Sequence, residues 1–254
     1  MTTTPLLEVQ NLSHHFGKFQ VLSRISLEIP AGALTALIGP NGAGKTTFYN
    51  LISGRFTPSE GRVVFNGRDI TGLPAHRVAT LGLVRSFQIT NIFPALSVLD
   101  NVAVPLLLLH RRGANFWRPL TGEKAVYRQA AQQLERVGLA AAAHRPAREL
   151  AYGDKRLVEM AIVLARDPKL VLLDEPTAGM NPEETDRMIR LIKTLADTSG
   201  TTFCLTEHDM KVVFAVASQI AVLHQGQLLA WGPPEKIRSD PKVRRAYLGG
   251  SLDA

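Results

Sequence analysis

Apolar and polar residues follow two different patterns near the start of the chain. Residues 25–29 alternate strictly between apolar and polar, which predicts a half-buried β-strand. Residues 33–38 are apolar at nearly every position, which is typical of a strand buried on both faces. A glycine-rich turn and a helix over about residues 45–53 follow. Two further strands are predicted over residues 7–9 and 62–65, the second ending in an Asn66-Gly67 turn.

The middle of the chain has helical periodicity from about residue 97 to residue 165, without convincing strands. After residue 169 strands alternate with helices again. Helices are predicted over 123–137 and 155–165, near Pro182 and after His208, strands over 170–173 and 201–206, and a hairpin over 219–231. The pattern therefore predicts an α/β fold with a mostly parallel sheet, a small antiparallel part and an inserted α-helical subdomain.

Composition narrows the class of protein. The 254 residues are 45% hydrophobic and 20% charged, which is ordinary for a globular protein and excludes a disordered or collagen-like chain. No apolar run approaches the roughly 18 residues of a membrane span, and residues 1–7 do not resemble a secretory signal. Cys204 is the single cysteine, so no intrachain disulfide forms, and its apolar surroundings predict a small buried side chain.

The net charge is +7. Such a balance favours an anionic partner, which here means a nucleotide, a nucleic acid or the inner face of a membrane. The net charge alone does not distinguish among these three kinds of partner. A solvated basic surface without a specific partner is the simpler alternative.

One segment matches the pattern G-x-x-x-x-G-K-[ST] between the predicted buried strand and the helix. Glycines at positions 42 and 44 allow backbone N–H groups to approach phosphate oxygens. Lys45 can then reach the β- and γ-phosphates, and the Thr46 hydroxyl can bind Mg²⁺. The alternative, a glycine-rich turn beside an unrelated lysine, requires a coincidence of pattern and context. The motif consists of Gly39, Pro40, Asn41, Gly42, Ala43, Gly44, Lys45 and Thr46.

Two other predicted strands end in polar residues. The apolar run 170–173 leads into Asp174, placed to hold the Mg²⁺ shell, and Glu175, placed to polarise an attacking water. His208 follows residues 201–206 and can hydrogen-bond a γ-phosphate, although a structural histidine is the simpler interpretation. Gln88 follows the strand-like residues 82–87, but a single glutamine is almost no evidence for a functional site.

Residues 150–155 place a glycine before a strongly helical pattern. A glycine turn that leads into a helix N-terminus can bind an anion. The alternative is an ordinary helix start in which Asp154 is the N-cap residue.

Five segments, in their order along the chain, resemble the nucleotide-binding subunit of ABC transporters over essentially the whole chain. They are the P-loop motif 39–46, Gln88, residues 150–154, the strand 170–175 with Pro176 and Thr177, and His208. The resemblance is closest to the ATPases that drive importers of branched-chain or hydrophobic amino acids. It rests there on residues 83–88, 178–182 and 247–249, and a loop over 111–122 is similar to one of the two ATPases of that group.

The resemblance implies an ABC-type P-loop NTPase domain over residues 5–250, with a helical subdomain over about 89–166, and ATP and Mg²⁺ as cofactors. It implies catalytic roles for Glu175, His208 and Lys45, and Mg²⁺ contacts for Thr46, Gln88 and Asp174. It also assigns nucleotide contacts to Phe16, which would stack on adenine unless it is a core aromatic, to the eight P-loop residues with Thr47, to Gln88, and to Ala151, Tyr152, Gly153 and Asp154.

Two positions depart from the commonest family pattern. Ala151 stands where a serine is usual in the signature segment, which reads Leu-Ala-Tyr-Gly-Asp, and Asn181 stands where an aspartate is usual in the segment 178–181. The resemblance assigns the signature segment to the ATP of an opposing subunit and residues 178–181 to communication between the two sites. Similar variants are familiar in the importer group, so the departures do not predict an inactive site.

The resemblance predicts an ATPase at the cytoplasmic face of the inner membrane that powers amino-acid import. The expected partners are two permease subunits, a second ATPase subunit and, indirectly, an extracytoplasmic binding protein, with no nucleic acid. Residues 89–103 would form much of the docking surface, although core packing is as good an explanation. Other solutes or export, a soluble ABC ATPase that acts on nucleic acid or ribosomes, and a GTPase are the alternatives, and the last lacks its guanine motif.

Overall fold

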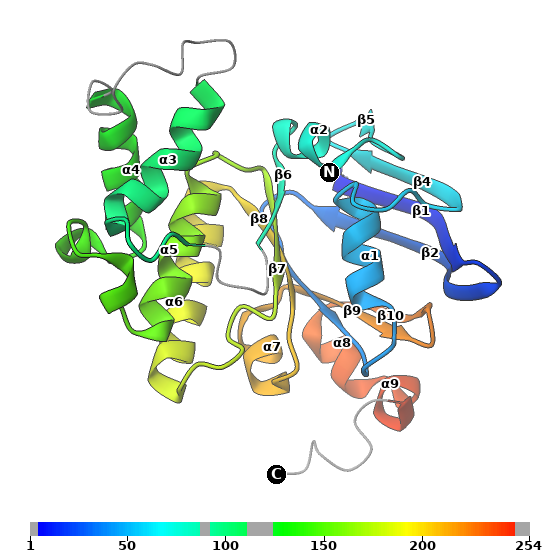
Figure 1. The fold of residues 1–254 in the computed structure, drawn as a ribbon. Helices are drawn as coiled ribbons and strands as arrows, with labels where there is room; N and C mark the ends of the chain where they lie inside the picture. The colour runs from blue at the N-terminus through cyan, green and yellow to red at the C-terminus, as the bar shows by residue number, and fades with distance from the viewer. Residues whose placement is uncertain (1–4, 87–91, 111–123, 247–254) are drawn as a thin grey trace. The chain divides into compact units, whose positions relative to one another are not determined.

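The computed structural model describes residues 5–86, 92–110 and 124–246, with side chains omitted at 108–110. Contacts divide the chain into two compact units (Figure 1). Unit 1 comprises residues 1–85, 169–176 and 192–254, and unit 2 comprises residues 86–168 and 177–191.

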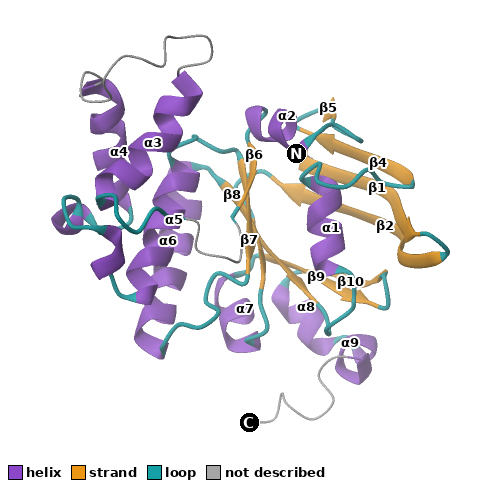
Figure 2. Cartoon of the chain, viewed as in Figure 1, coloured by secondary structure: helices purple, strands orange, loops and turns teal. Residues whose placement is uncertain are grey.

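Unit 1 contains a six-stranded sheet in the order β10-β9-β3-β8-β7-β6 (Figure 2). All neighbouring strands in it are parallel except β10, which pairs antiparallel with β9. Its strands are β3 (Leu34–Ile38), β6 (Leu83–Arg85), β7 (Leu170–Asp174), β8 (Thr202–Thr206), β9 (Gln219–His224) and β10 (Gln227–Gly232). All residues of β3 and β8 are buried, as expected for central parallel strands.

A second sheet in unit 1 is antiparallel, in the order β2-β1-β4-β5. Its strands are β1 (Pro5–Phe16), β2 (Phe19–Pro30), β4 (Glu60–Phe65) and β5 (Arg68–Asp69). The helices of unit 1 are α1 (Lys45–Ile52), α2 (Ala75–Thr80), α7 (Met210–Val216), α8 (Pro234–Ser239) and α9 (Pro241–Ala246). One buried apolar cluster joins strands of both sheets to α1.

Unit 2 is helical in its described residues (Figure 2). Its helices are α3 (Val98–His110), α4 (Lys124–Arg136), α5 (Tyr152–Leu164) and the first half of α6 (Pro182–Ser199), with short 3-10 turns η2 (Ala140–Ala142) and η3 (Ala147–Glu149). Helices α3, α4 and α5 pack on one another. The segment 178–181 belongs to this unit as well.

The predicted fold class is confirmed: the main sheet is mostly parallel, a small antiparallel sheet is present, and a helical part interrupts the chain. The predicted strand over 7–9 was too short, because β1 continues to Phe16 through irregular registers with β2 that a period-two pattern does not reveal. Cys204 is buried in β8 as predicted, and burial raises the pKa of its thiol to about 12.

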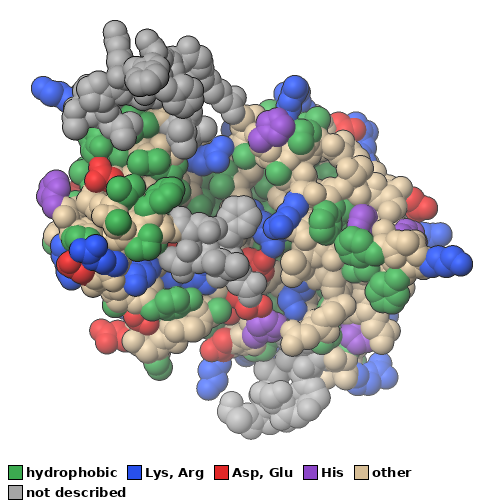
Figure 3. All heavy atoms as spheres, in the orientation of Figure 1, with side chains coloured by type: hydrophobic (Ala, Val, Ile, Leu, Met, Phe, Trp, Pro, Cys, Tyr) green, Lys and Arg blue, Asp and Glu red, His purple; other side chains and the backbone are tan. Residues whose placement is uncertain are grey.

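The basic residues are dispersed rather than gathered. Figure 3 shows Lys and Arg side chains spread over the visible face, interspersed with acidic ones. No helix in the described part of the chain is long and apolar enough to cross a membrane.

Two turn glycines offer a matched test of packing. Gly67 and Gly226 both have φ of 74°, but a Cβ at Gly67 would meet nothing within 4 Å, whereas one at Gly226 would collide with the carbonyl oxygen of Val21. We expect Gly67→Ala to lower the free energy of unfolding by about 1 kcal/mol through backbone strain alone. Gly226→Ala should cost about 1–3 kcal/mol more, since the backbone must also move. Equal losses in urea titrations would contradict this.

Candidate active site

The P-loop connects β3 to α1, and close packing requires two of its glycines, Gly39 and Gly44. A Cβ at Gly39 would collide with the carbonyl oxygen of Leu223 in β9, and one at Gly44 would lie 2.5 Å from Leu22 Cδ2. Gly42 has φ of 79° and open space around its Cβ position. Gly42 therefore leaves the loop open, while the other two glycines let the loop approach β9 and β2.

Helix α1 begins directly after the loop. Its N-cap residue is Gly44, which has no side chain to cap the first amides. The first N–H groups of a helix have no intrahelical acceptor and carry a partial positive charge, so they can bind an anion. Thr46 is exposed in this first turn and Thr47 is partly exposed.

The ammonium group of Lys45 is bound by backbone carbonyl oxygens of the P-loop. Its Nζ donates to the carbonyl oxygens of Gly39 at 2.5 Å and Pro40 at 3.2 Å. Burial lowers the pKa of Lys45, an effect opposed by the nearby carboxylates of Glu175 and Asp174. The ammonium group is thus positioned between the loop carbonyls and two acidic side chains.

Asp174, at the end of β7, is bound by side chains from both neighbouring strands. Arg85 of β6 contacts its Oδ2 at 2.6 Å, and the Thr206 hydroxyl of β8 donates to its Oδ1 at 2.8 Å. Arg85 also donates to Asn50 Oδ1 of α1 at 2.6 Å. The Asp174 and Arg85 side chains are both only 10% exposed, so the ion pair is largely shielded from water.

Glu175 follows in a left-handed conformation with φ of 49°. Its amide donates to the backbone and hydroxyl oxygens of Thr206, both at 3.1 Å. Its Oε1 lies 2.7 Å from Nε2 of His208, whose ring is 47% exposed. The structure therefore brings Lys45, Asp174, Glu175 and His208 together at the carboxyl ends of adjacent strands.

Phe16 is not a core aromatic, because it is 49% exposed at the end of β1. Its ring meets those of His14 and Phe56 edge-on, with centroids 4.7 and 5.6 Å apart. These contacts fix its orientation while leaving much of the ring open for stacking.

Gln88 lies outside the described residues, as do residues 111–122 and 247–249. The structure describes the segment 89–103 from residue 92 onward. Its side chains differ in how far they are buried. Val98, Val102 and Ala103 are buried, as the core-packing alternative predicted, whereas Phe93 is 55% exposed.

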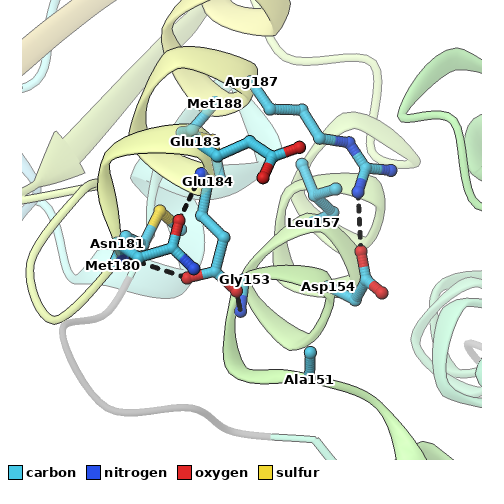
Figure 4. Close-up of a pocket in the computed structure, with 10 residues that line it drawn as sticks. All are labelled: Ala151, Gly153, Asp154, Leu157, Met180, Asn181, Glu183, Glu184, Arg187 and Met188. Carbon is cyan, nitrogen blue, oxygen red and sulfur yellow. Dashed lines mark hydrogen bonds and ion pairs between the residues drawn. The ribbon is translucent and has the colours of Figure 1, made fainter.

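The signature segment lies in unit 2. Here one expectation was wrong: α5 begins at Tyr152, so Gly153 lies within the helix and not before it, and the N-cap residue is Ala151 rather than Asp154. The carboxylate of Asp154 pairs instead with Arg187 of α6 at 2.8 Å. Figure 4 shows this pair beside Gly153, Glu184 and Asn181.

The sequence reasoning missed several residues that hold these groups. Arg85 and Thr206 bind Asp174, and Glu184 and Arg187 bind the signature segment. The sequence could have predicted an ion pair for Arg85, because it ends an otherwise apolar strand and a buried cation needs a carboxylate partner. Nothing in the sequence pairs Glu184 with Gly153.

Comparison with known proteins shows the family of this chain. A family profile described as ABC transporter matches residues 22–178. The chain belongs to the ABC transporter ATP-binding family. A second profile, described as branched-chain amino acid ATP-binding cassette transporter, matches residues 227–253. The two profiles together match this ABC ATPase over residues 22–178 and 227–253.

Curated relatives match nearly the full length. The chain is 40% identical over 252 residues to the high-affinity branched-chain amino acid transport ATP-binding protein LivG of Salmonella typhimurium, covering 96% of this chain and 98% of the relative. With the same coverage it is 39% identical over 253 residues to BraF of Pseudomonas aeruginosa, which has the same description. It is also 34% identical to the lipopolysaccharide export system ATP-binding protein LptB of Acidithiobacillus ferridurans.

Solved structures have the same fold. The ADP conformation of MJ1267, an ATP-binding cassette of an ABC transporter, superposes with a TM-score of 0.87 at 32% identity, covering 97% of this chain and all of that one. The dimeric post-hydrolysis state of the cassette MJ0796, bound to ADP and phosphate, superposes with a TM-score of 0.74 at 25% identity over 90% of this chain and 98% of that one.

The Arg85–Asp174 pair can be tested against an exposed counterpart. Arg62 and Asp69 form an ion pair at 2.8 Å, with side chains 55% and 44% exposed. We expect Arg85→Met to lower the free energy of unfolding by about 3 kcal/mol, because it leaves a shielded carboxylate without its cation. Arg62→Met should cost less than about 1 kcal/mol. Similar losses in denaturant titrations would show that the Arg85–Asp174 pair does not stabilise the site.

Proposed function

We propose that this chain is the ATP-hydrolysing subunit of an importer for branched-chain or other hydrophobic amino acids, at the cytoplasmic face of the inner membrane. The observation that carries the proposal is identity of about 40% over nearly the full length of LivG and BraF. The alternatives are an amide, urea or short-peptide importer, or an exporter such as that of LptB.

The P-loop geometry fits a nucleoside triphosphate. The opening at Gly42, the uncapped amides of α1 and the ammonium group of Lys45 together offer donors and positive charge to a polyphosphate. Phe16 offers an exposed ring face for adenine. In this proposal residues 5–250 form one nucleotide-binding domain, with its helical part over about 89–166.

The residues also fit a Mg²⁺ ion. The exposed Thr46 hydroxyl is free to face solvent in the first turn of α1, and the Asp174 carboxylate is held beside Lys45. Both Asp174 oxygens already accept bonds from protein groups, so this residue would contact the ion through water. When bound, Mg²⁺ would neutralise charge that develops on the phosphates. Gln88 would complete the shell.

Glu175 is the proposed general base. Its side chain is 24% exposed. Its amide donates to the backbone and hydroxyl oxygens of Thr206, and its carboxylate contacts His208. It can accept a proton from a water that attacks the γ-phosphate. His208 orients this carboxylate through Nε2, and in the doubly protonated ring the N–H of Nδ1 would also donate to a phosphate oxygen.

A complete site requires two chains in this proposal. ATP on the P-loop of one subunit would contact the signature segment of another, either a second copy or a paralogue. Charge-assisted bonds to the γ-phosphate would hold the two together, and hydrolysis would release them. Similarity to the dimeric MJ0796 cassette supports this arrangement. Two permease subunits, and through them an extracytoplasmic binding protein, are the proposed further partners.

The role of Glu175 has a direct test. We expect Glu175→Gln to bind ATP with unchanged affinity, because the side chain keeps its size, and to lower turnover at least about 100-fold, because it removes the base. Glu235→Gln, at an exposed position in α8, serves as the matched control and should keep full activity. Turnover of Glu175→Gln within a few-fold of the unaltered protein would refute the role.

The importer assignment is tested by affinity purification of the tagged chain from gently solubilised membranes. We expect two multi-spanning permeases and a second ATPase, identified by mass spectrometry, and leucine uptake when they are reconstituted together. Recovery of ribosomes or nucleic acid without a permease would contradict the transport function and leave the ATPase assignment standing.

A further inference from the structure

Glu184, in the first turn of α6, binds the start of two helices at once. Its Oε1 accepts the N–H of Gly153 at 3.1 Å, and its Oε2 accepts the N–H of Asn181 at 3.1 Å (Figure 4). Asn181 in turn caps α6 by accepting the N–H of Glu184 at 2.9 Å. One carboxylate therefore ties the signature segment to the segment 178–181.

Glu184 approaches Gly153 so closely that a side chain at position 153 would push the Glu184 carboxylate aside. A Cβ at Gly153 would lie 2.6 Å from Oε1, 2.7 Å from Cδ and 2.8 Å from Cγ of Glu184. The same side chains line a cavity of about 260 Å³ (Figure 4). Arg187 borders this cavity and is held by Asp154 at 2.8 Å and by the carbonyl oxygen of Gly138 at 3.3 Å.

This carboxylate occupies an anion-binding position. Amides in the first turn of a helix point outward and favour negative charge, and the Gly153 N–H has a single proton to donate. The proposed function assigns the signature segment to the γ-phosphate of ATP bound by an opposing subunit, and the present inference rests on that assignment. A phosphate oxygen and the Glu184 carboxylate would compete for this one proton, and their negative charges repel each other.

We propose that Glu184 is an internal ligand of the signature segment, which the γ-phosphate from the opposing subunit must displace before the two subunits close. Displacement also removes the acceptor of the Asn181 N–H, so nucleotide that binds at α5 breaks a hydrogen bond of the segment 178–181. The carboxylate thereby raises the ATP concentration at which the paired site fills. Arg187 stays beside the cavity when Glu184 leaves and offers a cation to the incoming phosphate.

The test compares Glu184→Ala and Glu184→Gln with Glu183→Gln in the purified transporter complex. Glu183 lines the same cavity, whereas the two amide bonds belong to Glu184. We expect the half-saturating ATP concentration for hydrolysis to fall at least about tenfold in Glu184→Ala, which corresponds to the loss of one competing charge-assisted hydrogen bond. The fall should be smaller in Glu184→Gln, which keeps an acceptor, and absent in Glu183→Gln.

Direct titration of ATP into the isolated chain separates this effect from the P-loop. Affinity there should be the same in all three variants, because only the opposing signature segment is altered. An unchanged or higher half-saturating ATP concentration in Glu184→Gln would overturn the inference and assign Glu184 to positioning α5. If the unaltered complex hydrolyses no ATP, the proposed function is refuted. That outcome is distinct from a negative result on Glu184, which leaves the ATPase function standing.

Discussion

The carboxylate of Asp174 is the point on which the candidate active site depends. It joins three adjacent strands at their carboxyl ends, because Arg85 of β6 and Thr206 of β8 each bind one of its oxygens. Thr206 also accepts the amide of Glu175, so the same interaction fixes the proposed base. A shielded carboxylate is costly unless every lone pair has a partner, and here the partners are what align the strand ends.

The P-loop and the proposed base are likewise held by contacts with neighbouring elements. The P-loop packs against β2 and β9 through glycines that admit no side chain, and Lys45 is held by two loop carbonyls. Glu175 is held in a left-handed conformation by neighbouring backbone. Donors and acceptors positioned before substrate arrives need no reorganisation during the reaction, which is the main way an ATPase gains rate.

Much of this was predictable from the sequence, for physical reasons. A buried parallel strand followed by a glycine-rich loop, and a second one followed by two acids, place Lys45, Asp174 and Glu175 at one edge of the sheet, because the carboxyl ends of parallel strands share that edge. What the sequence could not supply was the set of side-chain partners. Arg85 lies 89 residues before Asp174, and Glu184 lies 31 residues after Gly153, and only the strand order and helix packing bring each pair together. The alternative in which Asp154 caps α5 was wrong, because the extended residue that precedes the helix is Ala151.

These strand ends are proposed to hold a nucleoside triphosphate through the P-loop lysine. Calorimetric titration of a non-hydrolysable ATP analogue with Mg²⁺ into the chain and into Lys45→Ala measures this binding, with the exposed Lys193→Ala as control. We expect saturable binding to the unaltered chain and the control, and at least about a 100-fold loss in Lys45→Ala without unfolding, since charge-assisted phosphate contacts are removed. Affinity of Lys45→Ala within a few-fold of the unaltered chain would contradict it.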